Sequence, residues 1–74
     1  MTVILYTTVG CHLCEKAEAL LATVAPDMPV EKVDIAEDDA LVDLYGERIP
    51  VLAYQGEELG WPFGLLDVQR LIKR

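Results

Sequence analysis

The chain has 74 residues, 53% of them hydrophobic, and its thirteen acidic side chains outnumber six basic ones, for a net charge of −7. This length predicts one small domain spanning residues 1–74. An acidic surface repels nucleic-acid phosphates and anionic membranes, so we expect neither as a partner. Apolar runs are far shorter than the roughly 20 residues of a membrane span, and the N-terminus lacks the basic start of a signal peptide, which predicts a cytoplasmic protein.

The first half of the chain alternates between strand and helix patterns. Residues 2–6 are apolar and rich in β-forming side chains, which is typical of a short buried strand, and residues 7–10 form the expected turn. Leucine, alanine and valine at helical spacing predict an amphipathic helix over residues 12–25. Residues 30–35 alternate apolar and charged side chains imperfectly, which indicates a second strand near a sheet edge.

The second half predicts a helix, a hairpin and a final helix. Residues 36–45 are typical of a short acidic helix. Residues 51–54 and 57–59 indicate two short strands joined by a tight turn. The last helix is expected over residues 62–72, with Pro62 in its first turn, because proline is favoured there.

The resulting order of elements is β-α-β-α-β-β-α, which predicts an α/β fold. A strand, a crossover helix and a second strand form a right-handed parallel unit. The later hairpin then adds antiparallel strands to the same sheet. Helices must cover both faces of such a sheet to bury its apolar side chains.

The two cysteines are the strongest chemical signal. Cys11 and Cys14 follow the first predicted strand and open the first predicted helix. Unpaired N–H groups and the positive end of the helix dipole favour a thiolate there, and the thiolate is the reactive form. We expect Cys11 to attack a substrate disulfide, giving a mixed disulfide, and Cys14, one helical turn further on, to resolve it.

Two other interpretations of the cysteine pair stay open. The pair can be two ordinary reduced cysteines with no chemical role. It can also bind a metal, but it supplies only two of the four ligands of a zinc or iron–sulfur site, so we predict no metal site within one chain unless other residue types complete it. An iron–sulfur cluster bridged between two chains requires outside ligands such as glutathione. A binding module that carries such a cluster, or that docks a partner without turnover, is the alternative to an enzyme.

Four segments together resemble the glutaredoxin-like branch of the thioredoxin superfamily, in particular the small bacterial glutaredoxin-like proteins. They are Tyr6-Thr7, Cys11-His12-Leu13-Cys14, Val33-Asp34-Ile35 and Ile49-Pro50. The resemblance spans nearly the whole chain. It implies a thioredoxin-like fold whose four-stranded mixed sheet has the strand order 2-1-3-4, with a cis-proline facing the dithiol. It also implies a thiol-disulfide oxidoreductase with no bound cofactor, which takes part in electron transport and cell redox homeostasis.

Ile49 and Pro50 are candidates for binding substrate beside the dithiol. If their peptide bond is cis, as the resemblance implies, the Ile49 backbone is free to pair with an extended substrate segment. The alternative is a trans-proline at a strand start. Arg48 precedes them and can bind a carboxylate of glutathione or of a partner, unless it is a surface arginine paired with Asp43 or Glu47.

His12 and Tyr6 complete the candidate site. As a cation between the sulfurs, His12 stabilises the Cys11 thiolate and tunes the reduction potential, whereas as a solvated bystander it does neither. Tyr6 ends the first predicted strand, where its hydroxyl can flank the dithiol. The chain departs from the glutathione-using pattern, since the loop before Cys11 has no lysine and residues 59–63 replace a Gly-Gly-Asp-Asp-like segment.

The sequence therefore predicts a monomeric thiol-disulfide oxidoreductase in which Cys11 attacks, Cys14 resolves and Pro50 shapes the substrate groove. The expected substrate is a disulfide-containing protein or glutathione. The expected electron source is a thiol reductant or a reductase, and glutathione is one candidate for that role.

Overall fold

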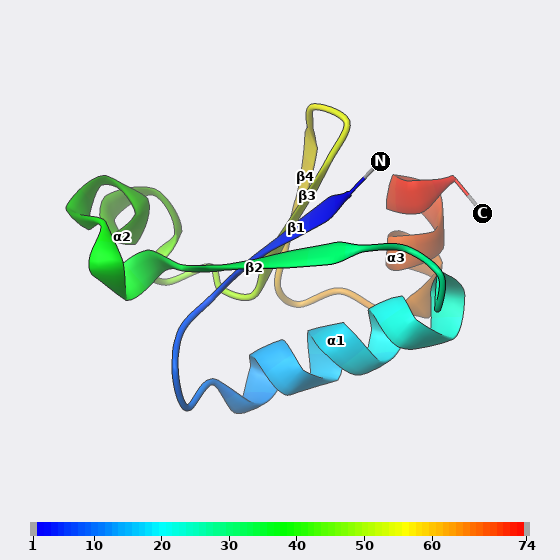
Figure 1. The fold of residues 1–74 in the computed structure, drawn as a ribbon, viewed down its shortest axis with the longest axis horizontal. Coiled ribbons are helices and arrows are strands. Elements are labelled where there is room, and N and C mark those ends of the chain that lie inside the picture. The colour runs from blue at the N-terminus through cyan, green and yellow to red at the C-terminus, as the bar shows by residue number, and fades with distance from the viewer. Residues whose placement is uncertain (1, 74) are drawn as a thin grey trace.

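Residues 2–73 form one four-stranded sheet with three α-helices around it (Figure 1). The structure is a computed structural model that describes these residues. Met1 and Arg74, the ends of the expected domain, lie outside the described residues. The elements in chain order are β1 (Val3–Thr7), α1 (His12–Val24), β2 (Val30–Asp34), the 3-10 helix η1 (Ile35–Glu37), α2 (Asp39–Tyr45), β3 (Val51–Tyr54), β4 (Glu57–Gly60) and α3 (Leu65–Ile72). This order confirms the predicted α/β fold, with one short 3-10 helix added.

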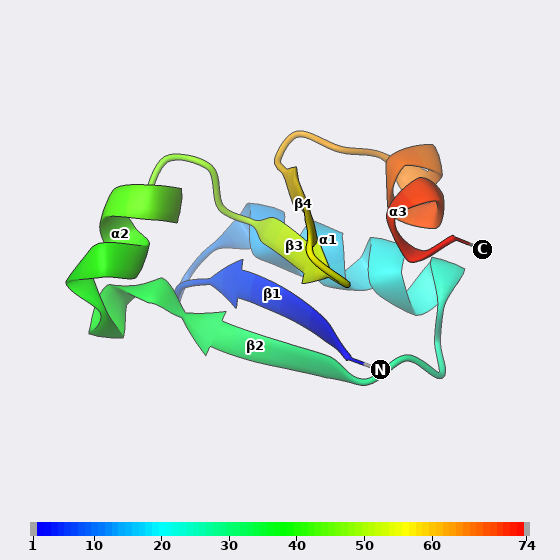
Figure 2. The ribbon, with the colours of Figure 1, turned by 90° about the horizontal axis from the view of Figure 1, so that it is seen from above.

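The strand order in the sheet is β2-β1-β3-β4, as the resemblance implied (Figure 2). β1 runs parallel to β2, with Val3 opposite Val30 and Thr7 opposite Asp34. β1 is antiparallel to β3, which pairs with β4 as a hairpin. The parallel pair requires a crossover, and α1 provides it. The carboxyl ends of β1 and β2 therefore meet at one end of the sheet, where the chain leaves β1 for Cys11.

The larger core lies between the sheet and the helices α1 and α3. Side chains alternate across a strand, so Val3 and Leu5 of β1 share this face with Leu52 of β3, and all three are fully buried. The helices contribute Leu21 of α1 and Val68 of α3. Each fully buried aliphatic side chain stabilises the fold by roughly 1.5–3 kcal/mol. Leu52→Ala would leave a cavity here and cost about 2–5 kcal/mol.

The opposite face of the sheet is covered at only one end. Ile35 and Tyr45 pack there against Val51 and Tyr6. α2 lies beyond the strand ends in both views and does not cross the middle of the sheet (Figures 1 and 2). The expectation that helices cover both faces is therefore met fully on one side and only partly on the other, where Ile4 is half-buried.

The helix predicted over residues 36–45 is confirmed for Asp39–Tyr45, which is α2, but its first part is wrong, because residues 35–37 form the separate 3-10 helix η1. Asp38 separates η1 from α2 as the C-cap of the first and the N-cap of the second, and its backbone is extended, with φ −140° and ψ 112°. The carboxylates of Asp34 and Asp38 each accept the N–H of the residue two positions on, Ala36 and Ala40, at 2.9 Å. Such local side-chain to backbone bonds cap new helix starts and compete with one continuous helix.

The last helix begins later than predicted. α3 starts at Leu65, so Pro62 does not occupy its first turn. Gly64 is the N-cap instead, and its N–H donates to the Asp67 carboxylate at 2.8 Å. Phe63 is buried in the main core. The burial of this ring and the cap at Gly64 outweigh the preference of proline for a first-turn position.

α1 matches its prediction most closely. It ends at Val24, and Ala25 closes it by donating its N–H to the Leu21 carbonyl at 2.8 Å. The buried residues Ala17 and Leu21 face the core, as their spacing predicts. Of the helices within residues 2–73, none combines the length and the apolar character that a membrane crossing requires.

Candidate active site

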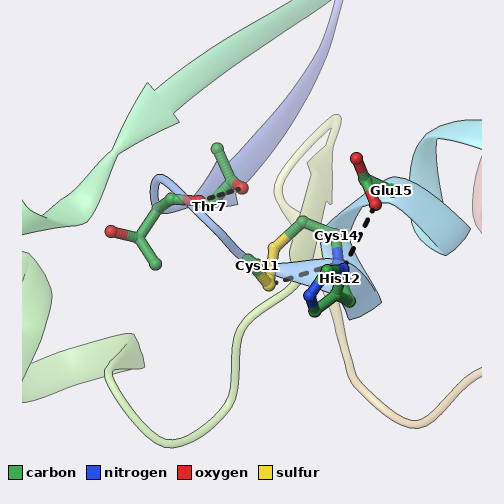
Figure 3. Close-up of a disulfide and its surroundings, with 6 residues drawn as sticks. Thr7, Cys11, His12, Cys14 and Glu15 are labelled. Atoms are coloured by element: carbon green, nitrogen blue, oxygen red, sulfur yellow. Dashed lines mark hydrogen bonds and ion pairs between the residues drawn. A yellow bond between two sulfur atoms is a disulfide. The ribbon is translucent and has the colours of Figure 1, made fainter.

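Cys11 and Cys14 are joined by a disulfide at the N-terminus of α1 (Figure 3). Their Cα atoms are 5.3 Å apart. The chain leaves β1 at Thr7 and turns back through Gly10, whose φ of 79° is accessible to glycine without strain. This turn makes Cys11 the N-cap of α1. The prediction that the cysteine pair opens a helix is therefore confirmed.

The two sulfurs differ in hydrogen bonding and in exposure. The backbone N–H of Cys14 donates to the Cys11 sulfur, with N and Sγ 3.2 Å apart. Cys14 is 2% exposed, whereas Cys11 is only half-buried. In the reduced protein the same N–H and the helix dipole would stabilise a Cys11 thiolate. Cys11 is thus the more accessible of the two sulfurs, and Cys14 is the shielded one.

An open cavity of about 390 Å³ lies beside the disulfide. The loop after β1, the first turns of α1 and the end of β2 enclose it. Besides the two cysteines, the lining side chains that can carry charge are His12, Glu15, Glu18, Lys32 and Asp34. Both cysteines line this cavity, so a group bonded to either sulfur would lie in or next to the cavity.

The charges around the cavity are acidic on balance. Lys32 forms an ion pair with Glu18 at 2.5 Å. His12 Nδ1 lies 3.6 Å from the Glu15 carboxylate, and both side chains are mostly in solvent (Figure 3). Asp34 is half-buried at the end of β2, where one of its oxygens accepts a backbone N–H at 2.9 Å. Since Lys32 is already paired, the Asp34 and Glu15 carboxylates set the sign of the local potential.

A second cluster lies on the other face of the sheet, around Tyr45. The rings of Tyr6 and Tyr45 stack with centroids 4.3 Å apart, and the Arg48 guanidinium carbon lies 5.7 Å from the Tyr45 ring centroid. The Tyr45 hydroxyl donates to the Glu58 carboxylate of β4. This hydrogen bond, together with burial and the negative charge of Glu58, raises the pKa of Tyr45 to about 12. The cluster ties the end of α2 to the sheet.

Ile49 and Pro50 lie at the sheet end where β1 leads toward the disulfide, because Val51 pairs with Tyr6. The Ile49–Pro50 peptide bond is cis, and Pro50 is fully buried. The expectation of a free Ile49 backbone is wrong for its N–H, which donates to the Tyr45 carbonyl at 3.0 Å. The last carbonyls of α2 lack donors within the helix, and this N–H satisfies one of them.

The predicted site residues therefore fall into two groups. The disulfide and His12 line the cavity, whereas the other four, Tyr6, Arg48, Ile49 and Pro50, do not. Of these four, Tyr6 and Arg48 belong to the Tyr45 cluster. Side chains alternate along β1, and Leu5 occupies the face toward α1, so the Tyr6 ring is directed to the opposite face. The hydroxyl of Tyr6 therefore belongs to the stacked pair and not to the cavity wall.

The sequence profile of one known family matches residues 2–74 of this chain. That family is described as the glutaredoxin-like domain (DUF836). The chain belongs to this family. The family predicted from the sequence segments is thereby confirmed. A comparison with curated proteins finds no match.

Solved structures agree with the fold of this glutaredoxin-like domain. The X-ray structure of protein XcR50 from X. campestris is 36% identical, with a TM-score of 0.88 over 97% of this chain and 96% of that one. The solution structure of protein Ne2328 from Nitrosomonas europaea is 27% identical, with a TM-score of 0.76 over 97% of this chain and 86% of that one. A structure described as a malarial protein, 19% identical with a TM-score of 0.57 over 99% and 96% of the two chains, shares the fold alone.

The charged wall of the cavity in this glutaredoxin-like domain was not predicted as part of the site. Its members are Glu15, Glu18, Lys32 and Asp34. For Asp34 a signal exists, since the carboxyl ends of neighbouring parallel strands meet at one sheet end and this residue ends the second predicted strand. The other three belong to no motif. Among residues 2–73, no group of three or more histidine, cysteine or acidic side chains is placed to hold a metal ion.

Proposed function

We propose that this glutaredoxin-like domain is a thiol-disulfide oxidoreductase that cycles between the Cys11–Cys14 disulfide and the dithiol. Family membership and the disulfide support a redox function. The proposal that Cys11 attacks and Cys14 resolves rests on one observation, the unequal environment of the two sulfurs. Cys11 is half-exposed and accepts a backbone N–H, whereas Cys14 is 2% exposed. An accessible thiolate attacks first, and a shielded thiol one turn away resolves.

The proposed reaction is two consecutive thiol-disulfide exchanges. The Cys11 thiolate attacks one sulfur of the substrate disulfide, a new S–S bond forms, and the other substrate sulfur leaves as a thiolate. Cys14 then loses its proton and attacks the Cys11 sulfur, which releases the second substrate thiolate and forms the Cys11–Cys14 disulfide. The substrate gains two electrons, and its thiolates take up protons from solvent. A thiol reductant or a reductase returns two electrons to the protein.

The proposed substrate-binding residues are Arg48, Ile49 and Pro50. Their place at the sheet end where β1 leads to the disulfide supports this role. The Ile49 N–H is engaged by Tyr45, so the Ile49 carbonyl is the backbone group that would pair with an extended substrate. Tyr6 acts as a positioning residue, because it stacks on the ring over which Arg48 lies. The domain would work as a monomer in the reducing cytoplasm.

A single-turnover reaction tests the proposal. The pre-reduced protein is mixed with a neutral disulfide, quenched with an alkylating agent and analysed by mass spectrometry. The unaltered protein should finish as the intramolecular disulfide. Cys14→Ser should stop at the mixed disulfide on Cys11, and Cys11→Ser should release no substrate thiol. Substrate reduction by Cys11→Ser would overturn the proposal.

Coupled assays then identify the electron source. Turnover is compared with glutathione plus its reductase and with thioredoxin reductase alone. The system that supports turnover identifies the class of electron donor that the protein uses. Visible absorbance in anaerobically purified protein would instead identify the iron–sulfur binding module that the sequence left open.

A further inference from the structure

We infer that this site prefers a disulfide flanked by positively charged groups and discriminates against anionic disulfides such as glutathione disulfide. The inference rests on the proposed thiol-disulfide exchange and names its substrate class. It starts from the cavity of about 390 Å³ that both cysteines line. During the exchange, half of the substrate is bonded to Cys11, so the charges of this cavity act directly on the groups that flank the reacting sulfur.

The cavity has an excess of negative charge. Among the described residues, its lining holds three carboxylates, one ammonium and one imidazole. The Lys32 ammonium is bound by Glu18 at 2.5 Å, so these two charges largely cancel at a distance. Within residues 2–73, Asp34 and Glu15 form no ion pair with a lysine or an arginine. An incoming cation is therefore attracted by these two carboxylates, and an incoming anion is repelled.

Asp34 is the stronger of the two determinants. It lies at the carboxyl end of β2 opposite Thr7, where the chain departs for Cys11, and a backbone N–H at 2.9 Å holds its carboxylate in place. It is also half-buried. A fixed and partly desolvated charge is screened less by salt than a mobile one. Glu15 is 76% exposed and lies 3.6 Å from His12, so its effect is weaker.

Arg48 does not offset this potential inside the cavity. Its guanidinium lies over the Tyr45 ring and borders a different cavity along α2, together with Asp43 and Glu47. The net charge of −7 acts in the same direction as the cavity at longer range, because it draws cations toward the protein and slows the approach of anions. Local and long-range electrostatics thus favour the same substrate class.

Three small disulfides of different charge test the inference. Pre-reduced protein reacts in single turnover with cystamine, which is cationic, with hydroxyethyl disulfide, which is neutral, and with glutathione disulfide, which is anionic. Each rate is divided by the rate of the neutral reagent dithiothreitol with the same disulfide, which removes differences in intrinsic reactivity. At low ionic strength the normalised rate with cystamine should exceed that with glutathione disulfide by about tenfold or more. The ratio should shrink at high ionic strength, because salt screens these charges.

Charge-altering variants assign the effect to the cavity. Asp34→Asn keeps the oxygen that accepts the backbone N–H and should reduce the cystamine to glutathione disulfide ratio by about fivefold. Glu15→Gln should reduce it by a smaller factor. Lys32→Gln frees the Glu18 carboxylate and should increase the ratio. Glu57→Gln is the matched control, since it removes one exposed charge at the other end of the sheet and should change the ratio much less than Asp34→Asn does.

The outcomes separate this inference from the function on which it rests. Failure to reduce the neutral disulfide would overturn the proposed exchange itself. Reduction of all three disulfides at equal normalised rates would overturn the charge preference and leave the exchange standing. Equal effects of Asp34→Asn and Glu57→Gln would show that net charge, and not the cavity, sets the preference. Two peptide disulfides, one flanked by lysines and one by glutamates, extend the test to polypeptides and should follow the same order.

Discussion

The backbone N–H of Cys14 donates to the sulfur of Cys11, 3.2 Å away, so the N-cap of α1 and the accessible sulfur of the disulfide belong to the same residue. An N-cap side chain satisfies one of the N–H groups that have no partner within the helix. Here a sulfur atom has that place. Reduction would leave this N–H directed at a thiolate, which couples the local helix start to thiol reactivity.

The first prediction concerns that reactivity. In the reduced protein at neutral pH, iodoacetamide should modify Cys11 about tenfold faster than Cys14, or more, because Cys14 is 2% exposed and Cys11 accepts the N–H bond. Peptide mapping over a time course measures both rates. Unfolded protein is the control, in which the two rates should converge. Equal rates in the folded protein would contradict the assignment of roles.

His12→Ala should make the reduction potential of the disulfide more negative, by about 30 mV or less. A protonated imidazole stabilises the reduced thiolate, but His12 is 93% exposed and lies 3.6 Å from Glu15, so solvent and the carboxylate weaken its effect. Glu15→Gln removes the opposing charge and should shift the potential the other way. Titration in a thiol redox buffer measures both. No change in either variant would make His12 a bystander.

The Tyr45–Glu58 hydrogen bond should make stability depend on alkaline pH. It requires a protonated Tyr45, whose pKa is raised from 10.0 to about 12 in the folded protein, while the unfolded chain ionises at the ordinary value. The stabilisation is therefore complete below about pH 10 and is lost as the pH rises through about 12. We expect a loss of about 1 kcal/mol, because Glu58 is exposed and the bond is open to water. Urea unfolding at about pH 8 and about pH 11 measures it.

Two variants isolate this contribution from other alkaline effects. Tyr45→Phe should lack this part of the pH dependence altogether. Glu58→Gln keeps a hydrogen-bond acceptor without the charge and should lose only part of it. If Tyr45→Phe kept the full alkaline loss of stability, another group would be responsible.

Gly46→Ala should destabilise the protein by about 1–3 kcal/mol. A Cβ atom at this position would lie 2.5 Å from the Val42 carbonyl oxygen, which accepts the Gly46 N–H at 2.8 Å and so cannot move away freely. Gly64→Ala is the matched control, because its Cβ would meet only the Asp67 carboxylate, at 3.9 Å. The control should cost less, about 0.5–1 kcal/mol, because alanine is a poorer N-cap than glycine but meets no steric clash there. Similar denaturation midpoints for the two variants would contradict the steric argument.

Local patterns were sufficient for most of the fold. The helix expected over residues 12–25 is α1, and the strands expected over residues 30–35, 51–54 and 57–59 are β2, β3 and β4 to within a residue. The predictions are wrong where a local interaction competes with the helix, because the spacing of apolar residues does not reveal such an interaction. The second helix is divided by the cap at Asp38, and Phe63 holds its segment outside the last helix.

The sequence by itself determined where the cysteine pair lies, because the spacing of Cys11 and Cys14 at a helix start depends only on local structure. Only the tertiary structure decided what surrounds that pair. Asp34 reaches the cavity because β2 runs parallel to β1, and Tyr6 turns away from it because strand residues alternate between faces. Such convergence depends on strand register and helix packing between segments far apart in the chain, and no single stretch of sequence encodes it.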